Sequence, residues 1–326
     1  MVLLLTESDV AALLPMEAAI GLMEEALVAF SAGRVRQPVR QALLVEPHGG
    51  YLGLMPAHLR AAGSAADALG AKAVTFYPPN AGRGLPTHMA AILLWDPATG
   101  RMLAIMDGRL ITEVRTAATS AAAAKALARA DAATLALLGS GVQARSHLEA
   151  FRRVRPLREV RIWSRTRAHA EALARESPLP ARVCDTPEAA VRGATLVVTA
   201  TSSPAPVLAG RWLAPGAHVT AVGAPRPDWR ELDAEAVARS RVFVDSRAGA
   251  LAESGDLLLA LQEGAIDERH IAGEIGEVLA GRLAGRTGPE EITLFKSLGM
   301  AVEDVAAAAY VYARARAQHV GREVEL

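Results

Sequence analysis

A glycine-rich turn near the middle of the chain constrains the fold more than any other feature of the sequence. The apolar residues 135–138 are followed at once by Gly-Ser-Gly-Val-Gln-Ala at residues 139–144, the pattern G-x-G-x-x-A between an expected strand and an expected helix. Gly139 permits the tight turn, Gly141 lets the backbone approach a pyrophosphate, and the small Ala144 lets the helix pack close to the strand. This segment predicts the start of a dinucleotide-binding domain.

Strand and helix patterns alternate after this turn. Short apolar runs, separated by polar segments of helical character, occupy residues 134–138, 159–163, 196–199, 218–222 and 241–245. Such alternation, with glycine at the turns, is typical of parallel strands with helices between them. The sequence predicts an α/β fold with a Rossmann-type, doubly wound parallel sheet.

The first hundred residues follow another pattern. Apolar residues recur at helical spacing from 20 to 30, which predicts an amphipathic helix. Short extended runs come next, and the last two, residues 90–94 and 102–106, flank a turn at 96–100. This arrangement predicts a hairpin within an α+β domain.

The end of the chain predicts that this α+β domain is discontinuous. A helix expected from residue 300 to about residue 316 lies beyond the last expected strand, and we expect it to return to the first domain. The predicted boundaries are 1–115 with 300–326 for the α+β domain and 116–299 for the Rossmann domain.

Composition excludes several classes of protein. Thirty-five basic residues cancel thirty-five acidic ones, so no overall field attracts nucleic acid or an anionic membrane. The single cysteine, Cys184, excludes an internal disulfide and a multi-cysteine zinc site, and it suits a reducing compartment. The apolar run at residues 2–5 lacks a basic segment before it, so we expect no signal peptide. We expect a cytoplasmic protein with no nucleic-acid, membrane or metal partner.

The residues after the second expected Rossmann strand favour NADP(H) over NAD(H). A NAD-binding unit usually ends this strand with Asp or Glu, which accepts hydrogen bonds from the ribose and would repel a 2′-phosphate. Here Ser164, Arg165, Thr166 and Arg167 follow the strand and offer hydroxyls and guanidinium groups. The alternative is that these arginines are solvated loop residues.

Three cations outside the Rossmann domain are candidates for binding a carboxylate. Arg40, Lys72 and Arg115 each lie beside apolar or small residues, and arginine can bind a carboxylate through two hydrogen bonds. Sequence spacing does not show whether they converge. Composition alone favours the alternative that each is an ordinary surface residue.

Together with the glycine-rich turn, four further motifs carry a family resemblance. They are Met-Pro-Ala at 55–57, Gly-Leu-Pro at 84–86, Arg-Thr-Ala-Ala at 115–118 and the segment 295–304. Over nearly its whole length the chain resembles the ornithine cyclodeaminase and mu-crystallin family, and the runs 222–232 and 253–256 resemble its ketimine reductase branch.

One position separates the two chemistries of that family. In the cyclodeaminases, the second residue after the glycine of the Val-Gly segment is an aspartate that acts on ornithine. Here that residue is Pro225, which neither binds an amine nor moves a proton. Asp228 lies three residues further on, and a loop cannot be assumed to place it equivalently. The resemblance therefore favours hydride transfer to an imine over ornithine cyclisation.

The resemblance implies roles for residues of both domains. Arg40 and Arg115 are expected to bind the substrate carboxylate, while Lys72 and Glu253 are expected to be catalytic. His88 and Trp229 are expected to line the substrate pocket. The residues expected at the cofactor are Thr116, Gly139, Gly141, Val142, Gln143, Ser164, Arg165, Thr166, Thr201 and Val222.

Less specific interpretations stay open for three of these residues. His88 fits a loop histidine, Trp229 fits a core or dimer contact, and Glu253 fits a carboxylate at the start of a helix.

The predicted function is NADPH-dependent reduction of cyclic imine carboxylates, such as pyrroline-2-carboxylate or piperideine-2-carboxylate, to L-proline or L-pipecolate. The alternatives are an amino-acid dehydrogenase that aminates keto acids reductively, a protein that binds NADPH and a small carboxylate without turnover, and a cyclodeaminase-type lyase. The resemblance also implies a homodimer formed through the α+β domain.

Overall fold

The computed structural model describes residues 1–60 and 67–325, which divide into two compact units. The first unit combines Met1–Arg115 with Met300–Leu326, and the second unit is Thr116–Gly299. Helix α3 (Arg109–Leu127) begins in the first unit and ends in the second. In the described part of the chain, no helix is both long enough and apolar enough to cross a membrane.

The first unit is built on a mixed sheet in the order β16-β1-β7-β6-β5-β4-β2, with β3 paired to β4. Its strands are β1 (Val2–Leu5), β2 (Val35–Arg36), β3 (Gln41–Val45), β4 (Gly50–Leu59), β5 (Ala68–Phe76), β6 (His88–Trp95), β7 (Met102–Asp107) and β16 (Arg322–Val324). The expected hairpin is present, because β6 and β7 pair antiparallel across the turn. The apolar N-terminal run forms β1, which pairs parallel with β7.

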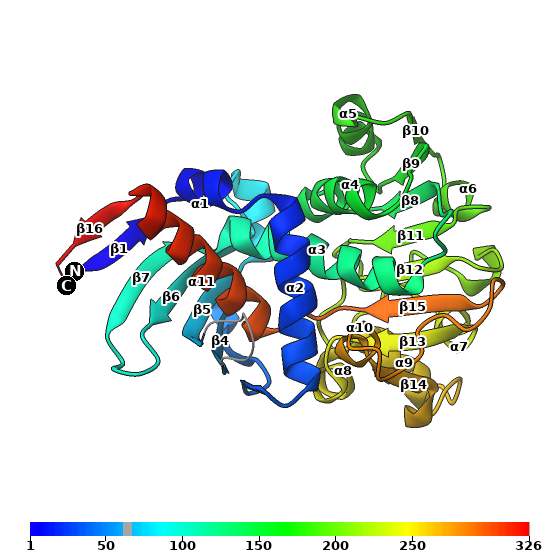
Figure 1. Cartoon of the computed structure of the whole chain (residues 1–326). Coiled ribbons are helices and arrows are strands. Elements are labelled where there is room, and N and C mark those ends of the chain that lie inside the picture. Colours follow the sequence, from blue (N-terminus) through cyan, green and yellow to red (C-terminus); the bar gives the residue numbers. More distant parts are fainter. Residues whose placement is uncertain (61–66, 326) are drawn as a thin grey trace. The chain divides into compact units, whose positions relative to one another are not determined.

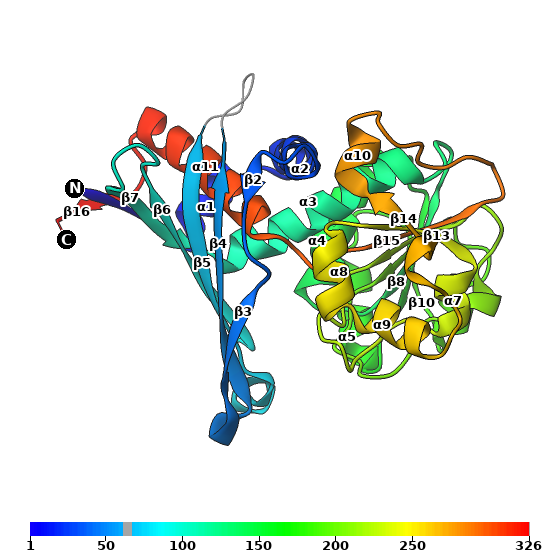
Figure 2. The same ribbon diagram turned by 90° about the horizontal axis from the view of Figure 1, so that it is seen from below.

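Helices α1 (Glu7–Leu13) and α11 (Ala301–Gln318) of the first unit contact this sheet (Figure 2). Helix α2 (Met16–Ser31) packs against α11. Helix α11 and strand β5 approach each other closely at Gly70. A Cβ on Gly70 would lie only 3.0 Å from Val305 of α11, so glycine makes this approach possible. The last helix of the chain therefore completes the first unit and lies against β4, β5 and β6.

The second unit contains an eight-stranded sheet in the order β10-β9-β8-β11-β12-β15-β13-β14, in which every pair is parallel (Figure 1). The strands are β8 (Thr134–Leu138), β9 (Glu159–Trp163), β10 (Ala181–Val183), β11 (Leu196–Thr199), β12 (His218–Ala221), β13 (Ser240–Val244), β14 (Ile271–Glu274) and β15 (Ile292–Lys296). The helices are α4 (Val142–Val154), α5 (Arg167–Glu176), α6 (Pro187–Val191), α7 (Ala234–Ala238), α8 (Arg247–Glu253), α9 (Gly255–Gln262) and α10 (Ile275–Leu279). The predicted Rossmann-type parallel sheet is confirmed.

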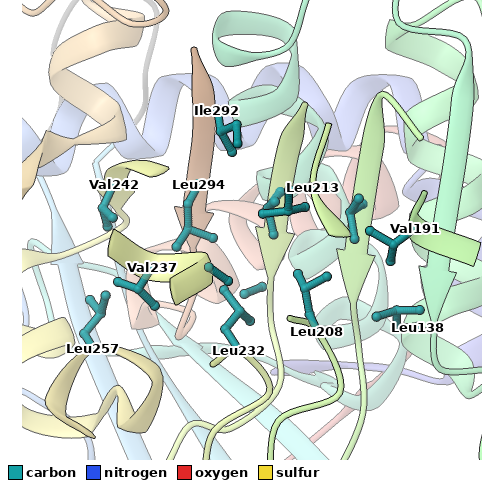
Figure 3. Packing of buried hydrophobic residues seen from close by; sticks show 14 of the residues in the cluster. Leu138, Val191, Leu208, Leu213, Leu232, Val237, Val242, Leu257, Ile292 and Leu294 are labelled. Atoms are coloured by element: carbon teal, nitrogen blue, oxygen red, sulfur yellow. The ribbon is translucent and has the colours of Figure 1, made fainter. Parts of the chain in front are cut away.

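The core of the second unit explains why its strands read as continuous apolar runs. Leu138, Leu294 and Val242 of the sheet pack with Val237 of α7 and Leu257 of α9 (Figure 3). Successive strand residues point to opposite faces, and the other residues of β8 and β15 are also largely buried. Both faces of the sheet are therefore covered, as parallel sheets require.

Candidate active site

A buried cluster of four charged side chains lies within the first unit. Lys72 Nζ of β5 is 2.7 Å from Asp304 Oδ2, and Arg115 of α3 donates to Asp304 Oδ1 at 3.0 Å and to Glu303 Oε2 at 2.6 Å. Lys72 also donates to Thr112 Oγ1 at 3.3 Å. Lys72 is 1% exposed and both carboxylates are 0% exposed. Charges this deeply buried are tolerated only when they are paired in this way.

Strand alternation and a helix start bring this cluster together. Lys72 shares the inward face of β5 with Gly70 and Val74, the face that packs against α11. Glu303 and Asp304 lie in the first turn of α11, where the helix dipole favours negative charge. Two elements that are distant in the sequence therefore bring a buried ammonium against a buried carboxylate.

The protonation states of the cluster suit proton transfer. Burial lowers the pKa of Lys72 to about 8, against the opposing effect of Asp304, and the charges of Arg115 and Arg40 lower it further. Burial acts to raise the pKa of Asp304, but Arg115 and Lys72 together hold it below its usual value. Asp304 is thus ionised near neutral pH, while Lys72 titrates just above it. A lysine in this range is a competent general acid.

His88 and Arg40 act on the same cluster. His88 begins β6, and burial, followed by the charges of Lys72 and Arg115, lowers its pKa to about 4. Its ring is therefore neutral near pH 7. Arg40 adds its charge to those acting on both Lys72 and His88. The structure thus gathers these four predicted residues in one unit, and the interpretation of His88 as a loop histidine is wrong.

The cluster contains as many cations as carboxylates. Lys72 and Arg115 pair with Glu303 and Asp304, and the charge of Arg40 also acts on Lys72. The pairing also limits Arg115, because its Nε and Nη1 already donate to carboxylates of the protein.

The glycine-rich turn of the second unit fits a pyrophosphate. Gly139 has a φ of +122°, and a Cβ there would lie 2.4 Å from the carbonyl oxygen of Ala200, so only glycine suits this position. A Cβ on Gly141 would meet no atom within 4 Å. Among the described residues, no side chain caps the N-terminus of α4, which begins at Val142, and the buried Oε1 of Gln143 has no hydrogen-bond partner. Uncapped helix N–H groups beside open space bind phosphate oxygens.

The loop after β9 presents the residues expected to select the cofactor. Ser140 Oγ donates to Ser164 Oγ at 2.8 Å, which joins this loop to the glycine turn. Arg167 is held by carboxylates on α5 and beyond it. Arg165 is exposed, and within residues 1–60 and 67–325 it has no ion-pair partner. Thr166 is the exposed N-cap residue of α5 and accepts no capping hydrogen bond from that helix.

Other predicted cofactor residues follow β11 and β12 in the same sheet. The Thr201 N–H donates to a carboxylate oxygen of Glu231 at 2.6 Å, and the Val222 N–H donates to the Thr199 carbonyl at 3.0 Å. Thr116 lies on α3, where its carbonyl accepts the Ser120 hydroxyl.

Trp229 and Glu253, both expected at the substrate, belong to the second unit. Trp229 is half-buried in the loop after β12, where the Arg226 guanidinium lies 4.9 Å from its ring centre, and its place at the substrate stays a prediction. Glu253 is the last residue of α8, and Ser254 caps the next helix. Glu253 therefore ends one helix and directly precedes the N-cap of the next, and its role at the substrate stays a prediction.

The sequence did not identify the acidic partners of the predicted cations. Glu303 and Asp304 stood in the motif at 295–304, without a role. Two adjacent acidic residues at the start of an alanine-rich helix were a usable signal for buried ion pairs. Such a helix is buried on most of its faces, and buried carboxylates need cationic partners. The second unit holds a comparable group, Glu231 with Asp256 and Lys296, that was likewise not predicted.

Comparison with known proteins shows the family of this chain. The sequence pattern of the ornithine cyclodeaminase/mu-crystallin family matches residues 2–319, and the chain belongs to this family. It is 47% identical to mouse ketimine reductase mu-crystallin over 89% of this chain and 90% of that protein.

Two further relatives are similar over almost the entire chain. The structure of Thermococcus litoralis Delta(1)-pyrroline-2-carboxylate reductase in complex with NADH and L-proline matches with a TM-score of 0.95 and 38% identity, over 99% of this chain and 100% of that one. The alanine dehydrogenase of Archaeoglobus fulgidus is 36% identical over 99% of this chain and 98% of that protein.

Proposed function

We propose that this protein, an oxidoreductase that acts on C=N bonds with a nicotinamide cofactor, is an NADPH-dependent reductase of cyclic imine carboxylates. The observation that carries the proposal is the buried Lys72–Asp304 pair beside Arg115, in which burial lowers the pKa of the lysine to about 8. Such a site suits an anionic substrate whose nitrogen must receive a proton. The similarity to a ketimine reductase and to a pyrroline-2-carboxylate reductase supports the same chemistry.

The chain's own residues supply binding and proton transfer. Arg40, with Arg115, binds the substrate carboxylate, and Lys72 Nζ delivers a proton to the imine nitrogen. A positive charge on that nitrogen lowers the barrier to accepting a hydride, and Glu253 stabilises this charge. Asp304 stays ionised and orients the lysine.

The second unit holds the cofactor. When bound, NADPH supplies a hydride to the imine carbon, so that new C–H and N–H bonds replace the π bond of C=N. The glycine turn at 139–144 and the N-terminus of α4 hold its pyrophosphate. Thr116, Thr201 and Val222 are assigned to its nicotinamide half, and Ser164 to its adenosine half.

A test of this function is a panel of substrates offered with NADPH and, separately, with NADH. We expect rapid cofactor oxidation with pyrroline-2-carboxylate or piperideine-2-carboxylate. Tight binding of these imines without cofactor oxidation would contradict the proposal and favour a binding protein.

We assign the preference for NADPH over NADH to Arg165. Replacing it by aspartate should raise the KM for NADPH by about tenfold or more, because a charge-assisted bond to the 2′-phosphate is lost and a repulsion is added. The KM for NADH should not rise. Initial rates with both cofactors measure this, and Arg175→Asp, the same charge change at the exposed end of α5, is the control. Equal effects of Arg165→Asp on both cofactors would remove Arg165 from the site.

The activity should depend on pH through Lys72. Because the protonated lysine is the active form, kcat/KM should fall as pH rises through about 8. Asp304→Asn removes the carboxylate that raises the pKa of Lys72, so the alkaline limb should move down by about one to three pH units.

The control for this pH profile is Glu113→Gln, which neutralises a carboxylate on α3 that pairs with Arg109 instead. The profile of this variant should match that of the wild type. An alkaline limb that stays in place in Asp304→Asn would contradict the assignment of Lys72 as the acid.

A second candidate reaction is reductive amination of a keto acid. The similarity to an alanine dehydrogenase over nearly the full chain favours it, and the reaction would use the same lysine and cations on an imine formed in the site. NADPH oxidation with pyruvate and ammonia or methylamine that exceeds the rate with preformed cyclic imines would establish this alternative.

We also propose a homodimer formed through the first unit. Leu43 and Leu44 of β3 are 66% and 64% exposed, and Leu54 of β4, Leu85 and Met89 are exposed as well. Exposed apolar side chains on the paired strands β3 and β4 are costly to leave in water and are typical of an interface. Light scattering should give the mass of two chains.

A further inference from the structure

A buried network of charged side chains joins the carboxyl ends of neighbouring strands in the second unit. Lys296, the last residue of β15, has its Nζ 2.8 Å from Asp256 Oδ2 and also donates to the carbonyl oxygen of Gly223, beyond the end of β12. Asp256 Oδ1 accepts the backbone N–H of Glu231 at 2.7 Å. None of the three charged residues is more than 1% exposed.

The Glu231 carboxylate connects the ends of two strands. It accepts the Thr199 hydroxyl of β11 at 2.8 Å, the Thr201 N–H at 2.6 Å and the Gly223 N–H at 2.8 Å. All three partners are hydrogen-bond donors. Oε2 accepts from Thr199 and Gly223, and Oε1 accepts from Thr201, so both carboxylate oxygens are used as acceptors. Together with Lys296, this carboxylate holds both the N–H and the carbonyl of Gly223.

The backbone at this point has little freedom. A Cβ on Gly223 would lie 2.4 Å from Glu231 Cδ and 2.4 Å from the Thr201 carbonyl oxygen. The next residue, Ala224, is buried and has a φ of +54°, in the left-handed region that residues other than glycine rarely adopt. Such a conformation persists only where surrounding contacts determine it, and residues of this kind concentrate at functional sites.

The strand order indicates which part of a dinucleotide this segment faces. The glycine turn that fits the pyrophosphate follows β8, and the loop with Arg165 follows its neighbour β9. Strands β11 and β12 lie on the other side of β8. A dinucleotide along the carboxyl ends of these strands, with its adenosine at β9, extends its nicotinamide toward β11 and β12.

We propose that Glu231, Asp256 and Lys296 are positioning residues that fix the segment 222–224 against the nicotinamide of the bound cofactor. This inference rests on the proposed function, because it requires a nicotinamide at this edge of the sheet. The network acts through the backbone of Gly223.

The test uses Glu231→Gln in the full chain. Glutamine keeps the shape of the side chain, but its amide nitrogen accepts no hydrogen bond, so either the Thr201 or the Gly223 N–H loses its partner. We expect kcat with pyrroline-2-carboxylate to fall about 10- to 100-fold, because a small misplacement of a reacting group has effects of this size. NADH should bind more weakly, whereas ADP-ribose, which lacks the nicotinamide, should bind as it does to the wild type.

Two more variants make the test decisive. Thr199→Val removes one donor to Glu231 with little change of shape, and it should lower kcat in the same direction, by about fivefold. Glu263→Gln is the control, because Glu263 pairs with Arg230 at the surface at 2.7 Å, and it should change neither binding nor rate.

Equal weakening of NADH and ADP-ribose, or an unchanged kcat in both Glu231→Gln and Thr199→Val, would overturn the inference and leave the network a purely structural role. A wild-type protein that binds ADP-ribose but reduces no imine with NADH or NADPH would instead contradict the proposed function.

Discussion

Replacing Lys72 by methionine should lower kcat by about 10²- to 10⁴-fold, the range that a positioned general acid contributes. Methionine keeps much of the length of the buried side chain but carries no proton for the imine nitrogen. Cofactor binding should persist, because the glycine turn belongs to the second unit. Steady-state rates with a cyclic imine and titration with NADPH measure the two effects separately.

Lys72→Arg separates the loss of a proton from the loss of a charge. Arginine keeps the positive charge opposite Asp304 but does not give up its proton near neutral pH. Its kcat should therefore stay close to that of the methionine variant, while the KM for the imine carboxylate should lie nearer the wild-type value. Near-normal turnover in either variant would exclude Lys72 as the proton donor.

Replacing Arg115 by methionine should have the largest effect on stability. The substitution removes the donor that lies 2.6 Å from Glu303 and one of the two cations that pair with Asp304, Lys72 being the other. Removing one member of a buried ion pair lowers the free energy of unfolding by about 3–5 kcal/mol. Urea unfolding followed by circular dichroism measures this loss.

Arg109→Met is the matched control on the same helix. Arg109 pairs with Glu7 and, at 2.6 Å, with Glu113, but its side chain is 31% exposed. An ion pair in contact with water contributes about 1 kcal/mol or less. If the Arg115 variant were no less stable than the Arg109 variant, the buried cluster would not be an important stabilising feature.

The local elements of the Rossmann sheet were predictable, but its strand order was not. The strand at 134–138 and the glycine turn after it have strong signals, because a buried parallel strand is apolar throughout and the turn requires glycine at particular positions. Strands β10, β14 and β15 were not predicted. Strand β15 ends in Lys296 and lies between β12 and β13, a position determined by packing across the whole sheet.

The site was predictable only one residue at a time. Sequence reasoning singled out Arg40, Lys72 and Arg115, yet no spacing rule connects β5 or α3 to α11. Arg115 and Asp304 are 189 residues apart in the sequence and 3.0 Å apart in the structure. Contacts of this kind depend on the last helix returning to the first unit. The pairing and burial of these residues and the lowered pKa of Lys72 could therefore be established only from the structure.

The most direct test follows the transferred hydrogen. The protein is incubated with pyrroline-2-carboxylate and NADPH that carries deuterium at nicotinamide C4 on the transferred face, and the product is analysed by mass spectrometry and NMR. Hydride reduction of the imine predicts L-proline with deuterium at C2 and one equivalent of NADP⁺. Unlabelled proline, or ammonia released from ornithine without net change in the nicotinamide, would contradict it.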